Sequence, residues 1–365
     1  MKISTTKEGM LNSVLLTERI VGKKESLPVL SCVLIDVGDR CVVRATNLEA
    51  GIEVVVPCEI MDRGVVAVRA NILSQTLRTI SGDKVVLRVE DGNLIIESRG
   101  TKTLIKAVPH EEFPSLGGIV EKGGVSVSRV DFMRGIQSVA YAASPSMIRP
   151  ELGSVYVSLK SNSITCVATD SFRLAEKVIS GVKGREDVDL LIPLKHALEL
   201  SHVLERVEGD VVRLSTDESQ MSITVGPVLY MSRVVDGTFP NYKEIIPKSF
   251  TTEVTLIKND LLEMLRKARV FSGSDQHIGL HVYPKRKIFS ATARSADVGE
   301  MSDSIDAATS GEDLDINFHI GYLTDCLSVI ESDSITLSFA GVGKSLVMRG
   351  VSDASFTYLV MPLNR

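Results

Sequence analysis

The sequence predicts an α+β fold made of three copies of one domain, each consisting of two strand–helix–three-strand modules. The prediction rests on a dipeptide that recurs at a constant interval and on helical segments that flank each recurrence in the same way. The length of 365 residues agrees with it, because domains usually contain ~100–200 residues.

The dipeptide Ala-Thr ends a strand-like run three times, and both intervals are 123 residues. The copies are Ala45-Thr46, Ala168-Thr169 and Ala291-Thr292. Each run follows another strand-like run and a turn, in the stretches CVLIDVGDR, VYVSLKSNS and LHVYPKRK. Two such runs joined by turn residues are typical of an antiparallel hairpin, so the same hairpin is predicted in each third of the chain.

A strand leading into an amphipathic helix precedes each hairpin, in KISTTKEGMLNSVL, VSVSRVDFMRGI and VTLIKNDLLEMLRKA. Apolar residues recur at matching positions with the spacing i, i+1, i+4, which gives one apolar stripe on a helix. These positions are Met10/Phe132/Leu261, Leu11/Met133/Leu262 and Val14/Ile136/Leu265.

A second helix follows each hairpin, in RANILSQTLRTI, PLKHALELSHVL and HIGYLTDCLSVI, and further strands close each copy. Its expected core positions are Leu73/Ala197/Leu323, Leu77/Ser201/Leu327 and Ile80/Leu204/Ile330. Boundaries near Lys122 and Phe250 divide the chain into domains at 1–121, 122–249 and 250–365. Six similar modules favour a curved array of continuous sheet with the helices on one face.

The composition is that of an ordinary soluble globular protein, with 44% hydrophobic and 24% charged residues. No apolar run approaches the ~18 residues that a membrane span needs, and the start, MKISTTKEGM, lacks the apolar core of a signal peptide. We therefore expect a cytoplasmic protein. The five cysteines are scattered without Cys-x-x-Cys spacing, which predicts neither disulfides nor zinc, and no cofactor is expected.

The charge is distributed unevenly between the predicted helices and the rest of the chain. The helical segments sum to +6, whereas the whole chain carries −5, so the remainder carries −11. A basic helical face on an acidic body indicates a polyanion as ligand. Without an aromatic-rich basic patch or a recognition helix, contact with a nucleic-acid backbone is favoured over base readout. The alternative, that the helices only carry solvating charge, stays open.

Two motifs suggest enzymes and are better explained as structure. AGVGKS, from Ala340 to Ser345, suggests a phosphate-binding loop, but Ser338 stands where the first glycine is required, so a glycine-rich hairpin turn is predicted. Only His196 and His202 share a predicted helix, and no Gly-x-Ser-x-Gly occurs, which argues against Ser-His-Asp catalysis. A passive repeat scaffold that binds only proteins remains an alternative.

Four motifs in order, together with the repeat, resemble the bacterial sliding clamp family, the β subunits of DNA polymerase III. They are LPVL, ATDSFRLA, FPNYKEIIP and YLVMPLNR, and the resemblance covers the chain from Met1 to Arg365. It implies a head-to-tail homodimeric ring with helices lining the hole and sheets outside. It also implies a non-catalytic processivity factor that a clamp loader places around double-stranded DNA, without sequence specificity, to tether the replicative polymerase and repair proteins.

The resemblance also assigns a groove for a partner's clamp-binding peptide between the second and third domains. On the residues alone, its apolar members read as ordinary core. Many relatives have Gly-His in place of Ser171-Phe172 and a basic residue in place of Glu244, so the preferred peptide stays open. The matching positions are Leu152, Thr169, Ser171, Phe172, Arg173, Leu174, Pro240, Ile245, His319, Tyr322, Val342, Ser345, Leu359, Met361, Pro362 and Leu363.

The resemblance also points to residues that contact DNA and residues that form the ring interface. Lys24, Arg149 and Lys195 match basic positions of the family. Helical location alone adds Arg78, Arg134, Arg266 and Lys267. For the interface, the resemblance pairs an edge strand of the first domain with the third domain of the next chain and points to Ile105, Val270 and Phe271.

Overall fold

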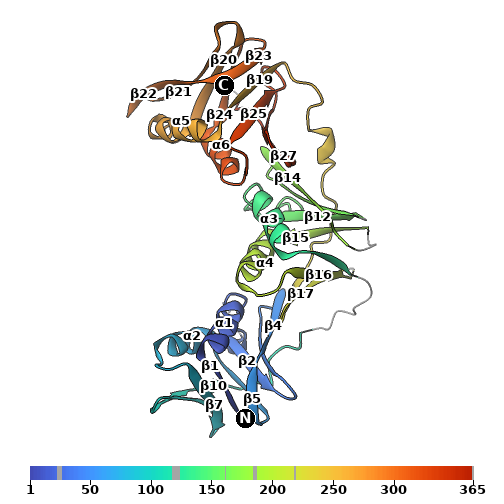
Figure 1. Ribbon diagram of the computed structural model, residues 1–365, viewed down its shortest axis with the longest axis vertical. Coiled ribbons are helices and arrows are strands. Elements are labelled where there is room, and N and C mark those ends of the chain that lie inside the picture. The colour runs from blue at the N-terminus through green and yellow to red at the C-terminus, as the bar shows by residue number, and fades with distance from the viewer. Residues whose placement is uncertain (23–26, 117–123, 161, 184–186, 218, 364–365) are drawn as a thin grey trace. The chain divides into compact units, whose positions relative to one another are not determined.

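The structure is a computed structural model that describes residues 1–22, 27–116, 124–160, 162–183, 187–217 and 219–363 (Figure 1). The chain forms two compact units. Unit 1 contains residues 1–133, 182–186 and 195–234, and unit 2 contains residues 134–181, 187–194 and 235–365. The units describe how segments pack, so the predicted division at 121/122 and 249/250 stays a prediction.

Unit 1 contains a five-stranded and a nine-stranded antiparallel sheet among its described residues. The five-stranded sheet has the order β5 (Cys58–Asp62), β1 (Lys2–Thr6), β7 (Lys84–Glu90), β8 (Asn93–Ser98), β9 (Thr101–Ile105). The nine-stranded sheet has the order β10 (Ala107–Val108), β6 (Gly64–Arg69), β2 (Cys32–Val37), β3 (Cys41–Thr46), β4 (Ala50–Val56), β18 (Val228–Arg233), β17 (Gln220–Val225), β16 (Val211–Thr216), β11 (Val125–Ser128).

Unit 2 contains a nine-stranded and a four-stranded antiparallel sheet among its described residues. The larger has the order β15 (Val188–Pro193), β12 (Ser154–Lys160), β13 (Ser163–Thr169), β14 (Arg173–Ser180), β27 (Asp353–Val360), β26 (Leu346–Gly350), β25 (Ser334–Phe339), β19 (Thr252–Ile257), β23 (Ala307–Gly311). The smaller has the order β22 (Gly299–Ile305), β21 (Ile288–Ser295), β20 (His277–Tyr283), β24 (Leu314–His319).

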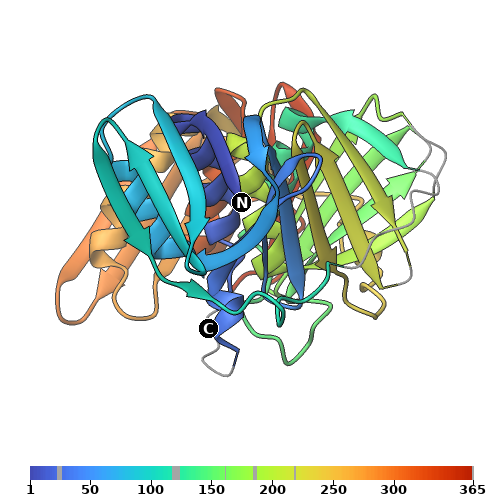
Figure 2. The ribbon, with the colours of Figure 1, turned by 90° about the horizontal axis from the view of Figure 1, so that it is seen from below.

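Helices cover these sheets as the apolar stripes predict. In unit 1, α1 (Lys7–Glu18) lies against α2 (Ala70–Thr79) and against β3 and β4 (Figures 1 and 2). In unit 2, α5 (Lys258–Phe271) lies against α6 (Ile320–Leu327), β21 and β22. The remaining helices are α3 (Arg129–Ala140) and α4 (Leu194–Arg206), and the short 3-10 turns are η1 (Pro28–Ser31), η2 (Tyr242–Glu244) and η3 (Pro284–Arg286).

The predicted core positions of the helices are confirmed. All nine positions predicted for α2, α4 and α6 are buried, and so are the first and third sets predicted for α1, α3 and α5. The middle set of Leu11, Met133 and Leu262 is half-buried in all three copies. The element order repeats strand–helix–three strands in each third of the chain, which confirms the predicted modules.

The repeat extends to the way in which paired helices are joined. Lys7, Arg129 and Lys258 each begin a first helix and donate a side-chain hydrogen bond to a carbonyl at the end of the second helix. The acceptors belong to Ile80, Leu204 and Ile330. The last carbonyls of a helix lack partners within it, so these cations satisfy them. Part of the basic charge counted on the helices is therefore structural.

No helix in the described ranges is long and apolar enough to cross a membrane. The glycine-rich segment AGVGKS forms a turn between β25 and β26, where the Lys344 N–H donates to the Gly341 carbonyl at 3.1 Å. Gly341 and Gly343 have φ values of 127° and 69°, which only glycine adopts readily. The prediction of a hairpin turn in place of a phosphate-binding loop is confirmed.

Candidate functional site

The turn from Thr169 to Arg173 connects β13 to β14 and is held by its own side chains. Thr169 Oγ1 donates to the Arg173 carbonyl at 2.6 Å and accepts from the Ser171 N–H at 3.2 Å. Asp170 Oδ1 accepts from the N–H groups of Phe172 and Arg173 at 2.9 and 3.0 Å. Ser171 has a φ of 78°, a conformation that a non-glycine residue keeps only where surrounding bonds hold it. The hydroxyl and carboxylate therefore shape the turn.

The guanidinium of Arg173 is anchored within unit 2. Its Nε donates to Asp170 at 3.0 Å, and its two terminal nitrogens donate to Asp325 at 2.6 Å and to the Tyr141 carbonyl at 2.7 Å. The guanidinium carbon also lies 4.4 Å from the centre of the Tyr322 ring. Burial opposes the charge, but the bond to Asp325 and the nearby Asp170 outweigh it and raise the pKa of Arg173. Arg173 thus fixes the turn to two other elements.

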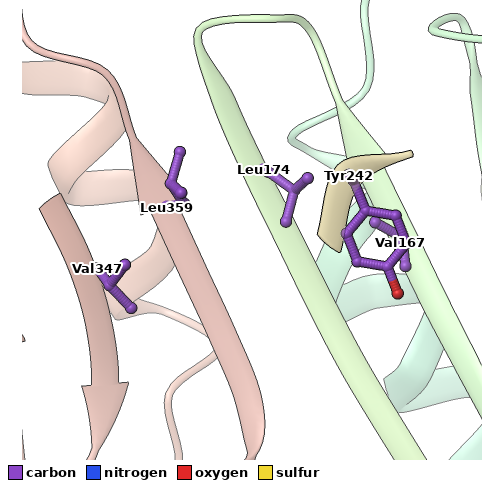
Figure 3. Packing of buried hydrophobic residues seen from close by; sticks show 5 residues of the cluster. All are labelled: Val167, Leu174, Tyr242, Val347 and Leu359. Carbon is purple, nitrogen blue, oxygen red and sulfur yellow. The ribbon is translucent and has the colours of Figure 1, made fainter. Parts of the chain in front are cut away.

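Five buried apolar residues form a cluster on the sheet beside this turn (Figure 3). They are Val167, Leu174, Tyr242, Val347 and Leu359, which come from β13, β14, η2, β26 and β27. We call them the apolar floor. The Tyr242 hydroxyl donates to Glu176, which fixes the segment FPNYKEII against the sheet. Burial, followed by this bond, raises the pKa of Tyr242.

Exposed apolar side chains lie close in sequence to the members of the apolar floor. Phe172 is 61% exposed, Ile245 52%, Val342 77% and Met361 37%. The Met361 N–H donates to the Phe172 carbonyl at 2.8 Å, so the C-terminal segment runs beside the turn. Phe172 and Met361 thus place two exposed apolar side chains beside each other, as is typical of a binding site for an apolar partner.

The predicted groove residues all belong to unit 2 and differ in exposure. The buried ones are Leu152, Thr169, Leu174, Ser345 and Leu359. The half-buried ones are Arg173, Pro240, His319, Tyr322, Pro362 and Leu363. The exposed ones are Ser171, Phe172, Ile245, Val342 and Met361. Among the buried group, Leu174 and Leu359 belong to the apolar floor, where only a neighbour's movement would expose them.

Sequence reasoning missed three members of the apolar floor. Val167 lies in the same strand as Thr169, and the alternation of side chains along β13 could have found it. Tyr242 lies inside the motif FPNYKEIIP, of which only Pro240 and Ile245 were predicted as groove residues. Val347 carries no local signal, because only the pairing of β26 with β27 brings it to this place.

The predicted DNA residues are exposed wherever they fall in the described chain. Lys24 lies outside the described residues. Several of the others make surface ion pairs, which contribute little and are readily exchanged for other partners. The exposed residues are Arg78 and Lys195 in unit 1 and Arg134, Arg149, Arg266 and Lys267 in unit 2.

The predicted interface residues divide between the two units. Val270 is 63% exposed and Phe271 is half-buried at the end of α5. Ile105 is only 5% exposed. Its neighbour Leu104, on the opposite face of β9, is 55% exposed.

One side-chain group in unit 1 has the composition of a hydrolase triad. His196 Nδ1 lies 2.8 Å from Ser232 Oγ, and His196 Nε2 lies 3.8 Å from a Glu49 oxygen. His196 and Ser232 are only 3% and 2% exposed, and the serine hydroxyl donates to the Arg233 carbonyl. His196 and Ser232 are therefore packed core, whereas the Glu49 side chain is 65% exposed. Among the described residues, no cluster of His, Cys, Asp or Glu has the arrangement of a metal site.

Comparisons with known proteins agree over the whole chain. Profiles of the N-terminal, central and C-terminal domains of the DNA polymerase III beta subunit match residues 1–117, 126–241 and 243–364. The "Beta sliding clamp" of Bacillus subtilis is 26% identical over 377 residues, covering 100% of this chain and 99% of that protein. That of Streptococcus pneumoniae is 25% identical and covers 99% and 98%.

Solved structures agree as well. The crystal structure of the DNA polymerase III beta subunit of Thermotoga maritima matches with a TM-score of 0.94 and 25% identity, over 100% of this chain and 99% of that one. The Pseudomonas aeruginosa subunit, at 23% identity and a TM-score of 0.94 over the full length of both chains, supports the fold alone. The chain therefore belongs to the family of DNA polymerase III beta subunits, the beta sliding clamps.

Proposed function

We propose that two copies of this chain join head to tail into a closed ring that encircles duplex DNA. The ring tethers the replicative polymerase and repair proteins, whose clamp-binding peptides bind at the exposed apolar side chains beside the apolar floor. It is a non-catalytic processivity subunit, and its family implies association with the polymerase III complex. A clamp loader places it on DNA, it works in the cytoplasm, and it needs neither a cofactor nor a membrane.

The strand order of the sheets carries this proposal. In the described chain, both nine-stranded sheets are joined where the last strands of two modules pair antiparallel, β4 with β18 and β14 with β27. The last strands left over are β9 and β22, each at an edge of the five-stranded or the four-stranded sheet. Pairing β9 of one chain with β22 of the next would make a third nine-stranded sheet. Two such contacts close a ring and cover edges that otherwise favour aggregation.

Solution mass tests the ring interface. We expect twice the 39.6 kDa of one chain for the unaltered protein. Leu104→Glu should favour the monomer, because it places a charge on the exposed face of β9. Met61→Glu is the matched control, since Met61 is 45% exposed on β5, at the other edge of the same sheet. An unaltered protein of monomer mass would reject the closed ring.

Retention on a circular plasmid tests whether the ring encircles DNA. Loaded onto a nicked circle with a clamp loader and ATP, the protein should stay bound and leave once the plasmid is linearised. Loss at the same rate from both forms would reject encirclement. It would favour the passive protein-binding scaffold, in which the basic helices only carry solvating charge.

Charge contacts to the DNA backbone are tested by salt dependence. Arg78→Ala should lower the salt slope of DNA binding by about one unit, because each phosphate contact contributes ~0.9 to that slope. Arg63→Ala is the control, since Arg63 is equally basic, exposed and located in a strand connection away from the helices. Equal slopes for the two variants would remove Arg78 from the DNA surface.

The peptide groove is tested at its most exposed aromatic residue. A peptide with the C-terminal sequence of the organism's replicative polymerase serves as the probe, followed by fluorescence anisotropy. Phe172→Ala should weaken its binding about tenfold, because burying such a ring contributes ~1.5–3 kcal/mol. Phe172→His, which restores the residue common in the family, should change the affinity for the same peptide. Val211→Ala, which alters a 58% exposed residue of unit 1, should leave it unchanged. Binding unaffected by either Phe172 variant would remove Phe172 from the site.

A further inference from the structure

Unit 1 contains a second copy of the turn that carries Arg173. Thr46 Oγ1 donates to the Ala50 carbonyl at 2.9 Å and accepts from the Leu48 N–H at 3.0 Å. Asn47 Oδ1 accepts from the N–H groups of Glu49 and Ala50 at 3.0 and 2.7 Å. Leu48 has a φ of 77°, where Ser171 has 78°. The 46–50 turn therefore reproduces the 169–173 turn bond for bond.

The elements beside the two turns correspond as well. In unit 2 the Tyr358 hydroxyl donates to the Tyr322 carbonyl at 2.8 Å, and in unit 1 the Tyr230 hydroxyl donates to the His196 carbonyl at 3.2 Å. His196 of α4 is thus the counterpart of Tyr322 of α6. The loop after the first helix closes alike in both units, through a 2.8 Å bond from Gly22 N–H to the Leu30 carbonyl and another from Ser144 N–H to the Leu152 carbonyl.

One side chain is missing from this correspondence. Ala50 stands at the strand position of Arg173, so unit 1 supplies no guanidinium of its own there. A Cβ at Gly51 would meet Leu116 on one face of β4, and Ala50 therefore faces the other side, where α1 packs. The counterparts of the groups that hold the Arg173 guanidinium are the Arg19 carbonyl, the Glu199 carboxylate and the His196 ring. Asn47 stands in the place of Asp170, but its second side-chain atom is an NH2 donor where Asp170 has an accepting oxygen.

A cavity of about 360 Å³ lies among these counterparts in unit 1. Arg19, Asn47, Glu49, Lys195 and Glu199 supply its polar lining. A guanidinium group with its aliphatic stem fits easily within this volume. Residues 23–26, which follow the lining residue Gly22, lie outside the described residues and form no part of the proposed site.

Glu199 is a carboxylate of this cavity that is only partly compensated. Its Oε2 is buried and has no hydrogen-bond partner among the described residues. Its other oxygen forms an i,i+4 ion pair with Lys195 Nζ at 3.8 Å, and this pair contributes little because the Lys195 side chain is 64% exposed. Burial raises the pKa of Glu199, as expected for a carboxylate withdrawn from water without full compensation.

We propose that this cavity of unit 1 binds a guanidinium group, such as an arginine side chain of a partner, in the place that Arg173 fills in unit 2. Glu199 accepts two hydrogen bonds from the guanidinium, as carboxylates commonly do. The Arg19 carbonyl accepts a further one, and the carboxylates of Glu49 and Glu199 together balance the charges of Lys195 and Arg19. The site is independent of the peptide groove, because its residues all belong to the other unit.

Calorimetric titration of the full-length protein with arginine amide tests the site. We expect one binding site per chain, and at least about tenfold weaker binding of citrulline amide, which has the same shape but no charge. Glu199→Gln should weaken arginine amide about tenfold or more. Glu205→Gln, which removes an exposed carboxylate from the same helix, should leave the affinity unchanged.

Ala50→Arg provides the reciprocal test, because the chain then supplies its own guanidinium and binding of arginine amide should disappear. If that variant fails to fold, the comparison of Glu199→Gln with Glu205→Gln still decides. Equal affinities for arginine amide and citrulline amide would overturn the proposal, as would equal binding by the two glutamine variants. Lysine amide binding as tightly as arginine amide would overturn the assignment to a guanidinium.

Discussion

The 46–50 turn and the 169–173 turn have one backbone and two different surfaces. Both use a buried threonine and an Asn or Asp side chain to hold the same four hydrogen bonds. Only the threonine is identical, and the largest differences are at the fourth and fifth positions, where Glu49 and Ala50 stand against Phe172 and Arg173. The first turn offers a carboxylate beside a cavity, and the second offers an exposed ring above an anchored arginine.

The segments at the ends of the first and second predicted domains show the same relation. Leu116 of FPSL lies over Gly51 of β4, and a Cβ at Gly51 would come within 2.4 Å of the leucine. Tyr242 of FPNY lies at the corresponding place and packs with Leu174 of β14. The two segments follow the same backbone path, but the residues in contact differ: Leu116 contacts Gly51 in unit 1, and Tyr242 contacts Leu174 in unit 2. Repetition thus preserves the hydrogen-bonded frame and leaves the side chains on it free to acquire separate functions.

Removing the anchor of the second turn should have the largest effect. Arg173→Ala should lower the free energy of unfolding by about 3 kcal/mol, because it leaves the Asp170 carboxylate and the Tyr141 carbonyl without their partner. Urea titration measures the loss. Ala50→Gly, at the same position of the first turn, is the control and should cost about 1 kcal/mol or less. Equal losses at the two positions would mean that Arg173 is not an anchor.

The threonines test whether the two frames are energetically alike. Thr46→Val and Thr169→Val should each cost about 1–2 kcal/mol, because each removes one donated and one accepted hydrogen bond from a buried site. The two losses in urea titrations should agree closely. A large effect at one threonine and none at the other would break the equivalence of the turns.

At acid pH, His196 should lower the stability of the protein, whereas its counterpart Tyr322 should not. Burial and the neighbouring Lys195 lower the pKa of His196, so the folded protein favours its neutral form. Stability from this group is complete above the ordinary pKa of 6.5 and is lost as pH falls through the lowered value, at about 1.4 kcal/mol per pH unit at most. Thermal unfolding between pH 7 and pH 5 measures it.

His196→Gln should flatten the dependence of the unfolding temperature on pH. The histidines His202 and His319 also have lowered pKa values, so the variant should remove only part of the slope. An unchanged slope in His196→Gln would assign the acid sensitivity to those other two groups.

The left-handed residues should give the smallest effect, and one of opposite sign. Leu48→Gly and Ser171→Gly should each raise the free energy of unfolding by about 0.5 kcal/mol, because glycine adopts a positive φ without the strain of a side chain. Differential scanning calorimetry of both variants measures the gain. Destabilisation of both would show that the side chains contribute more than the strain costs.

Much of the fold could be predicted because it depends on local patterns. The apolar stripes and the turn residues of AGVGKS each act within a short stretch, and the 123-residue interval is the repetition of one such short pattern. The modules, buried helix faces and turn that they predict are confirmed. The groove positions came through resemblance, and the apolar floor explains why the residues alone suggested core: Leu174 and Leu359 are buried. Ile105 and Leu104 are adjacent, and only the packing of β9 shows which one faces outward.

The sequence by itself determined the modules, the helix faces and the shared frame of the two turns, because hydrogen-bonding residues and apolar periodicity act over a few positions. Only the tertiary structure decided that Arg173 meets Asp325, 152 residues away, and that Ala50 leaves the matching cavity open in unit 1. Such outcomes depend on which distant elements pack together, and a pattern within one segment carries no information about its partner across the sheet.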